Sequence, residues 1–376
     1  MKIGIEAQRI FRADKHGMDF VILEVLRHLQ LKDRNNEYYV FVAPGQDHCL
    51  ESTKQMHIIE VKCPTYPLWE QLALPYAVYQ TGVEVLHCTS NTAPLYCPVP
   101  LILTLHDIIY LNTSKNKKMT RYQQLGWYYR RWNVPKIVNR CKHIITVSNT
   151  EYTNILKYFP KIEKELSVVH NGYSDCYHPL PEKKRIAITN KYLPDNKYLF
   201  FLGNTDPRKN TEGVLRAYNK YLKHSQQSLK LVITGLQQRY VDNLLIDIGL
   251  KINISNIICT NYVPSEDLPA LYNGAYAFLY PSLKEGFGIP VLESMACGTP
   301  VITSNCSSLP EVAGAGGLLV NPLDPNDIAK ALLQLESDPI LYQQQSIYGL
   351  ERVKHFSWQH TAEKYVNIYQ QLTHKS

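Results

Sequence analysis

Residues 276–303 read YAFLYPSLKEGFGIPVLESMACGTPVIT, and the pattern of side chains changes three times along them. An apolar run at 276–280 predicts a buried strand, and a glycine-containing turn follows it. Residues 290–296 predict a helix, and residues 300–303 predict a second buried strand. Buried strands that alternate with helices indicate parallel β-α-β units whose sheet is covered on both faces. This stretch therefore predicts an α/β fold.

The same alternation extends in both directions and forms two successive series. The first series predicts strands at 3–6, 39–43, 58–61, 83–87, 101–106, 143–147 and 166–169, and helices at 18–31, 68–81, 121–139 and 149–159. The second predicts strands at 198–203, 230–235, 257–260, 276–280, 300–303 and 317–320, and helices at 211–223, 238–248, 265–273, 290–296 and 325–336. A last helix is expected at 358–372, after a break near Phe356.

Residues 175–195, between the two series, are rich in proline and charge and lack a periodic element. We interpret them as an interdomain linker. The chain has 376 residues, which suits two domains of ~150–200 residues each. We therefore predict two Rossmann-like domains, at 1–180 and 181–356, with ligands bound beyond the carboxyl ends of the strands.

Composition excludes several classes of protein. The 45% share of apolar residues excludes a disordered chain, and no apolar run approaches the ~20 residues of a spanning helix. The first six residues read as a strand and not as a signal peptide. Nine scattered cysteines fit free thiols in the cytoplasm. A net charge of +7 suggests an anionic partner.

The strongest local motif is Glu285-Gly286-Phe287-Gly288-Ile289-Pro290-Val291-Leu292-Glu293. Its glycines expose backbone N–H groups at a helix start, where the helix dipole favours phosphate or a polarised sugar hydroxyl. The carboxylates of Glu285 and Glu293 can accept hydrogen bonds from vicinal hydroxyls of a sugar or ribose. The structural alternative makes Glu285 a helix N-terminal charge and Glu293 a solvated residue.

Two further motifs follow predicted strands. Arg208 and Lys209, in Gly203-Asn204-Thr205-Asp206-Pro207-Arg208-Lys209-Asn210, suit a diphosphate. The alternative is a surface turn that caps the following helix through Asn210 or Thr211. His106, followed by Asp107, is positioned to bond a sugar hydroxyl, or is a structural histidine.

Several nucleotide-binding motifs are absent. No Gly-x-Gly-x-x-Gly follows the first strand, which argues against a nicotinamide dehydrogenase. There is no P-loop motif. No Asp-x-Asp occurs, so the usual acidic clamp for a divalent metal on a sugar nucleotide is missing. A leaving diphosphate would then be neutralised by Arg208, Lys209 and helix N-termini.

These motifs, in this order along essentially the whole chain, resemble glycosyltransferase family 4. The Glu285-to-Glu293 motif, the Pro207-Arg208-Lys209-Asn210 turn and His106-Asp107 carry the resemblance, together with Val147-Ser148-Asn149, His170-Asn171-Gly172, residues 296–302 and Leu309-Pro310-Glu311. It implies the GT-B architecture, two facing Rossmann-like domains with a C-terminal helix, 357–376, that crosses back to the first. The first domain, 1–180, would then take the acceptor, and the second, 181–356, the nucleotide-sugar donor.

The resemblance also implies a metal-independent, retaining transfer from a nucleotide-sugar, with no cofactor. Glu293 would bond the ribose, Glu285 the donor sugar, and Arg208 and Lys209 the diphosphate. The turn Gly286, Phe287, Gly288 and Ile289 would hold sugar and phosphate, and His106 would touch the sugar. Gly17 stands where relatives carry a glycine-rich loop, and Asn204 where many carry an arginine, so Arg208 is expected to compensate.

The overall pattern resembles bacterial mannosyltransferases of polysaccharide assembly, which makes GDP-mannose the first expected donor and a UDP-hexose the second. A saccharide or a lipid-linked saccharide is the expected acceptor. A non-catalytic scaffold that binds sugar nucleotides or membranes, and an epimerase of the same fold, are the alternatives.

Residues 112–150 contain no Asp or Glu, and cations alternate with aromatic residues around Trp127 and Trp132. One interpretation is that residues 112–142 contact an anionic membrane at its cytoplasmic face. The other is that the aromatic face packs on the domain. Nucleic-acid binding is not expected, because no recognised module is present.

Overall fold

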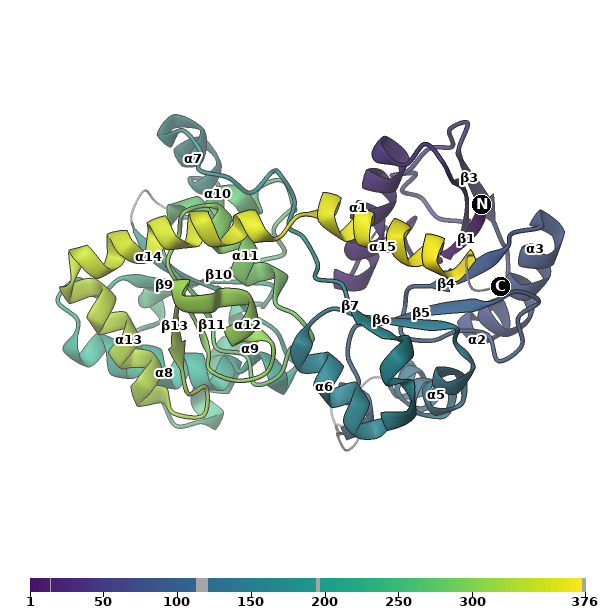
Figure 1. Ribbon diagram of the computed structural model, residues 1–376. Coiled ribbons are helices and arrows are strands. Elements are labelled where there is room, and N and C mark those ends of the chain that lie inside the picture. The colour runs from purple at the N-terminus through teal and green to yellow at the C-terminus, as the bar shows by residue number, and fades with distance from the viewer. Residues whose placement is uncertain (14, 113–120, 194–196, 374–376) are drawn as a thin grey trace. The chain divides into compact units, whose positions relative to one another are not determined.

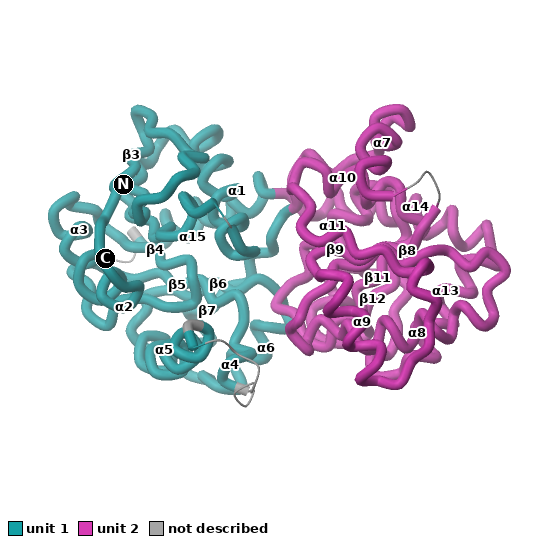
Figure 2. Tube along the Cα trace, turned by 180° about the vertical axis from the view of Figure 1, so that it is seen from behind, with its two compact units in different colours: residues 1–172, 358–376 teal, residues 173–357 magenta. Residues whose placement is uncertain are grey.

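The computed structural model describes residues 1–13, 15–112, 121–193 and 197–373. The chain forms two compact units (Figures 1 and 2). One contains Met1–Gly172 and the chain from Trp358 onward, and the other contains Tyr173–Ser357. The division after Gly172 lies ahead of the predicted boundary at 180/181. No helix in the described part of the chain is long and apolar enough to cross a bilayer.

The first unit is built on a seven-stranded parallel sheet with the order β3-β2-β1-β4-β5-β6-β7. Its strands are β1 (Lys2–Glu6), β2 (Glu37–Val42), β3 (Met56–Glu60), β4 (Val85–Cys88), β5 (Leu101–Leu105), β6 (His143–Thr146) and β7 (Leu166–Val168). Its helices are α1 (Gly17–Lys32), α2 (Tyr66–Leu68), α3 (Leu74–Thr81), α4 (Ile109–Asn112), α5 (Arg121–Ile137), α6 (Asn149–Tyr158) and α15 (Trp358–Thr373).

The second unit is built on a six-stranded parallel sheet with the order β10-β9-β8-β11-β12-β13. Its strands are β8 (Tyr198–Leu202), β9 (Lys230–Thr234), β10 (Ile257–Asn261), β11 (Ala275–Tyr280), β12 (Val301–Ser304) and β13 (Gly317–Val320). Its helices are α7 (Glu182–Thr189), α8 (Thr211–His224), α9 (Gln238–Asp247), α10 (Leu268–Gly274), α11 (Ile289–Ala296), α12 (Leu309–Ala313), α13 (Pro325–Ser337) and α14 (Pro339–Arg352).

All thirteen predicted strands are present, and the predicted α/β class is confirmed. The interpretation of 175–195 as a linker without a periodic element is wrong, because α7 occupies part of it and packs on α10. Only Thr189 of α7 is buried, so the helix carries no apolar stripe that sequence periodicity could reveal.

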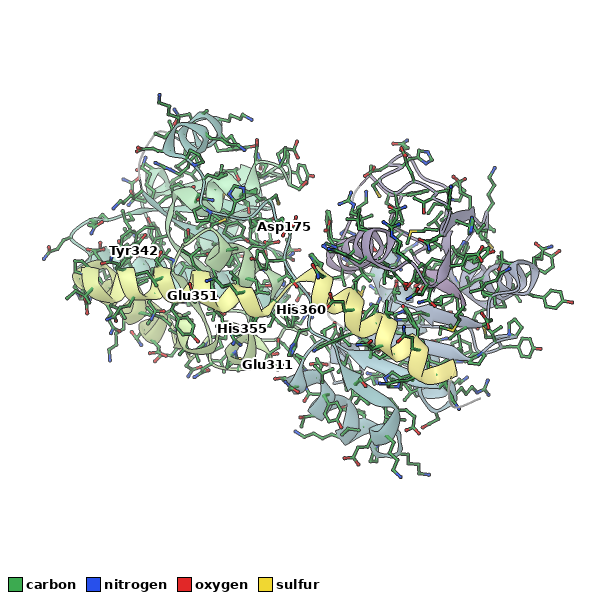
Figure 3. The ribbon with its side chains drawn as sticks, turned by 45° about the horizontal axis from the view of Figure 1, so that its top comes forward. Asp175, Glu311, Tyr342, Glu351, His355 and His360 are labelled. Carbon is green, nitrogen blue, oxygen red and sulfur yellow. The ribbon has the colours of Figure 1, made fainter. Side chains whose placement is uncertain are left out.

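The C-terminal helix belongs to the first unit although it follows the second along the chain, as predicted. The helical conformation is interrupted between His355 and Trp358. Figure 3 labels His355 before this interruption and His360 after it. Beyond it α15 packs on α1 (Figure 1). The hydroxyl of Tyr369 is hydrogen-bonded to Nδ1 of the buried His87, at 2.7 Å, which anchors α15 on β4.

Each sheet reverses its strand order at one place, between β1 and β4 in the first unit and between β8 and β11 in the second. In open parallel sheets, ligands bind beyond the carboxyl ends of the strands at such a switch point. The segments after β8 and β11 contain Arg208, Lys209 and Glu285. The fold therefore places three of the predicted site residues at the switch point of the second sheet.

Candidate functional site

The loops after β8 and β11 are fastened to each other by hydrogen bonds. The backbone N–H of Leu283 donates to the carbonyl of Arg208 at 2.7 Å. The side-chain amide of Asn210 donates to the carbonyls of Pro281, at 2.9 Å, and Pro322, at 2.7 Å. Asn210 therefore joins three loops. Its side chain does not cap α8, although the structural alternative offered Asn210 as a cap of this helix.

Lys209, Tyr280 and Glu285 form a closed triangle of polar contacts. Nζ of Lys209 lies 2.7 Å from Oε1 of Glu285 and 2.9 Å from the hydroxyl of Tyr280, which donates to the same carboxylate oxygen at 2.9 Å. Burial opposes the charge of Lys209, but Tyr280 and Glu285 outweigh it and raise the pKa of Lys209. The triangle thus keeps an ammonium group charged in a half-buried position.

Arg208 is held by Asp206, a residue that the sequence motifs did not single out. Its Nε and one terminal nitrogen donate to Oδ2 of Asp206 at 3.0 and 2.7 Å. Burial acts against the carboxylate, but the hydrogen bonds from Arg208 prevail and lower the pKa of Asp206. Both predicted diphosphate cations therefore have a carboxylate partner, and a bound diphosphate would share each cation with it.

The turn from Glu285 to Gly288 is fixed by two serines that follow β12. The hydroxyl of Ser307 donates to the Glu285 carbonyl at 2.6 Å and accepts from the Glu285 N–H at 3.0 Å. The hydroxyl of Ser308 donates to the Phe287 carbonyl at 2.6 Å. Phe287 itself is buried and packs on Phe356. Its side chain therefore anchors the turn.

Gly288, which precedes the first residue of α11, has a φ of +123°. This region is strained for residues with a side chain, and a Cβ here would lie 2.7 Å from the side chain of Leu309. The backbone of the turn consequently depends on glycine at this position. Ile289, the first residue of α11, is half-buried.

Glu293 lies about one turn after Ile289 in α11. It is not a solvated residue, so the structural alternative for Glu293 is wrong. It is half-buried and accepts a hydrogen bond from the hydroxyl of Tyr272 at 2.9 Å, and the hydroxyl of Tyr177 bonds it as well. Burial raises the pKa of Glu293 to about 7, although both hydrogen bonds act in the opposite direction. Glu293 is therefore poised to change charge near neutral pH.

The remaining predicted residues, His106 and Gly17, belong to the first unit. His106 is buried just after β5, and its Nε2 lies 2.9 Å from the carbonyl of Thr89. Burial lowers the pKa of His106, so its ring is neutral. Nε2 then carries the proton and donates a hydrogen bond to the Thr89 carbonyl, and Nδ1 is an acceptor. Asp107 accepts from the N–H of Ile109. Gly17 begins α1 with open space around it.

Sequence reasoning missed Asp206, Tyr177, Tyr272 and Tyr280, which hold the predicted charged groups. Tyr280 carried a usable signal, because it ends the buried strand that leads into the glycine turn. Tyr177 and Tyr272 are distant in sequence from Glu293 and follow no motif, so only the fold brings them together.

Two sequence families match the chain. The family described as Glycosyltransferase Family 4 matches residues 16–175, and the family Glycosyl transferases group 1 matches residues 183–352. O-antigen chain mannosyltransferase B of Escherichia coli is 31% identical over 274 residues, which cover 72% of this chain and 70% of that protein. O-antigen chain mannosyltransferase RfbU of Salmonella typhimurium is 30% identical over 283 residues, with 73% and 70% covered.

A solved structure extends the likeness to the whole fold. Sucrose-phosphate synthase from Thermosynechococcus elongatus superimposes with a TM-score of 0.75 at 20% identity, and the match covers 100% of both chains. At this identity the likeness concerns the fold. Together with the family matches it confirms the predicted resemblance. The chain belongs to glycosyltransferase family 4 and is a glycosyltransferase with the two-domain α/β fold called GT-B.

Proposed function

We propose that this glycosyltransferase moves a hexose from a nucleotide-sugar to a saccharide or lipid-linked saccharide in surface polysaccharide assembly. GDP-mannose is the first donor proposed and a UDP-hexose the second. The names of the relatives support mannose, since both are O-antigen chain mannosyltransferases. The observation that carries the proposal is the set of cations and carboxylates at the switch point of the second sheet, above all the Lys209–Tyr280–Glu285 triangle.

Each group of the donor has a counterpart in this set. The ammonium of Lys209 and the guanidinium of Arg208 neutralise the diphosphate, so the reaction needs no metal ion. The carboxylate of Glu293 accepts hydrogen bonds from the ribose hydroxyls, and that of Glu285 from a hydroxyl of the sugar. The backbone of residues 286–289 holds the sugar and the phosphate. The contact of His106 with the sugar, which the resemblance implies, stays a prediction.

The proposed chemistry is a retaining transfer without a side-chain nucleophile. The bond between the anomeric carbon and the diphosphate breaks, and the acceptor oxygen bonds that carbon on the same face of the sugar. The proton of the acceptor hydroxyl passes to the departing phosphate oxygen. Lys209 and Arg208 stabilise the negative charge that develops on the diphosphate, which is where preorganised charge accelerates a reaction most.

Thermal unfolding with GDP, UDP, GDP-mannose and UDP-hexoses tests the donor. A ligand at about 100 times its Kd stabilises the folded state by about 2.7 kcal/mol, so we expect GDP and GDP-mannose to raise Tm by several degrees. A shift with UDP compounds alone would transfer the proposal to a UDP-hexose. Absence of any shift, with no turnover of any donor, would refute it. Conversion of the donor to its epimer without an acceptor would instead support the epimerase.

We further propose that α5 rests on anionic lipid at the cytoplasmic face of the membrane. Residues 113–120 of the predicted contact lie outside the described residues. Along α5, some residues fit packing on the domain and others fit the membrane contact. Trp127 is buried in the first unit, whereas the exposed fractions of Leu125, Tyr128 and Trp132 are 69%, 53% and 45%. Exposed aromatic residues beside cations suit a lipid–water interface. Nζ of Lys136, 4.2 Å from the ring of Trp132, supplies one such cation.

Flotation with vesicles of phosphatidylglycerol tests the membrane contact. We expect the protein to float at low salt and to remain in solution at high salt, because the attraction of cations to anionic lipid is screened. A Tyr128→Ser/Trp132→Ser variant should float less. Tyr262→Ser is the matched control, since Tyr262 is 79% exposed in the second unit. Wild-type protein that does not float at low salt, or two variants that float equally, would contradict the proposal.

A further inference from the structure

The glycine turn before α11, residues 286–288, has little of its own to hold it in shape. Gly286 and Gly288 carry no side chain, and glycine loses more conformational freedom on ordering than any other residue. The side chain between them is that of Phe287, which is 4% exposed. The conformation of the glycine turn therefore depends on the groups that pack on Phe287.

An aromatic ring from the end of the second unit packs on Phe287. The centroid of the Phe356 ring lies 5.9 Å from that of the Phe287 ring, with an angle of 69° between the two planes, and Phe356 is buried. Edge-to-face contacts of this kind are favourable between aromatic rings. Only Ser357 separates Phe356 from the point where the chain leaves the second unit. The glycine turn thus rests on the segment through which the chain leaves this unit.

Arg352, the last residue of α14, ties Phe356 to α12. Its guanidinium lies 5.0 Å from the centre of the Phe356 ring, within range of the attraction between a cation and an aromatic face. Its Nε donates to the carbonyl of Val312 at 3.0 Å, and a terminal nitrogen donates to the carbonyl of Glu311, labelled in Figure 3, at 2.6 Å. The last carbonyls of a helix lack partners within it and carry partial negative charge, so they favour a cation.

Helix α12 returns to the glycine turn at its other end. Ser308, the residue before α12, donates its hydroxyl to the Phe287 carbonyl at 2.6 Å. The contacts therefore form a closed circuit, which runs from the Phe287 backbone through α12 to Arg352, then to the Phe356 ring and back to the Phe287 ring. This circuit holds both the backbone and the side chain of Phe287.

Close packing of α14 on α11 gives the circuit a firm base. Gly349 in α14 is buried, and a Cβ on it would lie 3.2 Å from the side chain of Met295 in α11. The hydroxyl of Ser346 donates to the carbonyl of Gly298, two residues after α11, at 2.5 Å. Tightly packed interiors transmit displacements. The end of α14 is thereby fixed relative to α11, the helix that follows the glycine turn.

We propose that Arg352 and Phe356 are positioning residues for the nucleotide-sugar, which act through Phe287 by holding the glycine turn in the form that receives the sugar and the phosphate. A turn that is ordered before the ligand arrives lowers the entropic cost of binding. Coupling of this kind is reciprocal, so a bound donor also holds the segment 352–357 more firmly. This inference rests on the proposed function, because it concerns the same donor site.

A double-mutant cycle on donor affinity tests the inference without turnover. The probe is GDP-mannose, or the UDP-hexose if that gives the larger thermal shift, titrated into wild type, Phe287→Leu, Phe356→Leu and the double variant. We expect each single variant to raise Kd about three- to tenfold, in the range of one aromatic pair. The double variant should bind no more weakly than Phe287→Leu, because both changes act through one contact.

Two further variants keep the test independent of folding. Arg352→Met retains the apolar stem but loses both hydrogen bonds to α12, and it should raise Kd in the same range even if Phe356→Leu does not fold. Tyr342→Leu is the matched control, since Tyr342 also lies on α14 and its ring stacks on that of Tyr276, with centroids 4.7 Å apart. It should lower Tm and leave Kd unchanged.

Amide hydrogen exchange measures the reciprocal effect. The backbone N–H of Phe356 donates to the carbonyl of Val353 at 2.9 Å, so its exchange reports the opening of this segment. Saturating donor should slow this exchange about three- to tenfold in wild type, the same factor as the loss of affinity, and should not slow it in Phe287→Leu. A purely structural role would lower Tm without this dependence on ligand.

The outcomes separate this inference from the proposed function. Additive losses in the double variant would overturn the inference while the proposed function stands. So would wild-type donor affinity in Phe356→Leu and Arg352→Met, an equal loss in Tyr342→Leu, or exchange at Phe356 that the donor leaves unchanged. A wild-type protein that binds no nucleotide-sugar would instead remove the proposed function, and this inference with it.

Discussion

Replacing Lys209 by methionine is expected to lower kcat by about 100- to 1,000-fold, the range found when one preorganised charge or donor is removed from a transition state. The ammonium of Lys209 lies 2.7 Å from Glu285 and is held in place by Tyr280. Under the proposed function, its removal takes away a charge that stabilises the departing diphosphate. It also leaves Glu285 without its cation. Steady-state transfer to the best glycoside acceptor, measured beside Tm, separates lost chemistry from lost folding.

The effect expected at Arg208 is smaller than that at Lys209. Arg208→Ala removes a cation that is 39% exposed and shared with Asp206, so we expect a rise of about tenfold in donor KM, in line with one charged hydrogen bond. Glu285→Gln keeps the shape of the triangle and should slow transfer more than it weakens donor binding. Wild-type kcat in Lys209→Met would show that the triangle is structural. Unchanged donor affinity and turnover in Arg208→Ala would exclude its compensating role for Asn204.

The sequence predicts the two sheets because their strands are short, apolar and buried on both faces. Each such strand can be recognised from its own residues, and the alternation of strands with helices indicates the α/β fold class. It also predicts the positions of Arg208, Lys209 and Glu285, because each lies in the loop that follows a buried strand. Helix α7 was not predicted because it is polar and mostly exposed.

The partners of the charged groups could not be predicted from the sequence. Tyr272 and Tyr177 reach Glu293 from other segments of the second unit, and their contacts depend on packing between elements. The motif therefore marks Glu293 as a candidate but does not indicate that it is half-buried, nor that its pKa is raised. Along α5, composition alone likewise does not distinguish the buried Trp127 from the exposed Trp132.

The raised pKa of Glu293 makes donor affinity depend on pH near neutrality. In the proposed donor complex the carboxylate form of Glu293 accepts hydrogen bonds from both ribose hydroxyls, whereas the protonated form would have lost part of this capacity. Burial raises the pKa of Glu293 to about 7 in the ligand-free protein. One unit below this pH about nine-tenths of the carboxyls are protonated, so affinity for the nucleotide-sugar should fall about tenfold between pH about 8 and about 6.

The stability of the fold depends on pH in the opposite direction to donor affinity. Because the pKa of Glu293 is higher in the folded than in the unfolded chain, the folded state binds the proton more tightly. The free energy of unfolding should therefore fall as pH rises from about 4.5 to about 7, by at most about 3 kcal/mol from this group. The difference between wild type and Glu293→Gln in chemical unfolding across this range measures it.

Calorimetric titration with the nucleotide-sugar that gives the largest thermal shift decides whether Glu293 holds the ribose. A nucleotide-sugar is the better probe than GDP, whose terminal phosphate itself titrates near neutral pH. Glu293→Gln should bind it at least about tenfold more weakly at the higher pH, from the loss of charged hydrogen bonds, and its affinity should no longer vary with pH. Glu336→Gln is the matched control, because Glu336 is also held by a tyrosine hydroxyl, that of Tyr221 at 2.6 Å, but has a lowered pKa. Equal pH dependence in Glu293→Gln and wild type would assign the titration to another group and remove Glu293 from the ribose site.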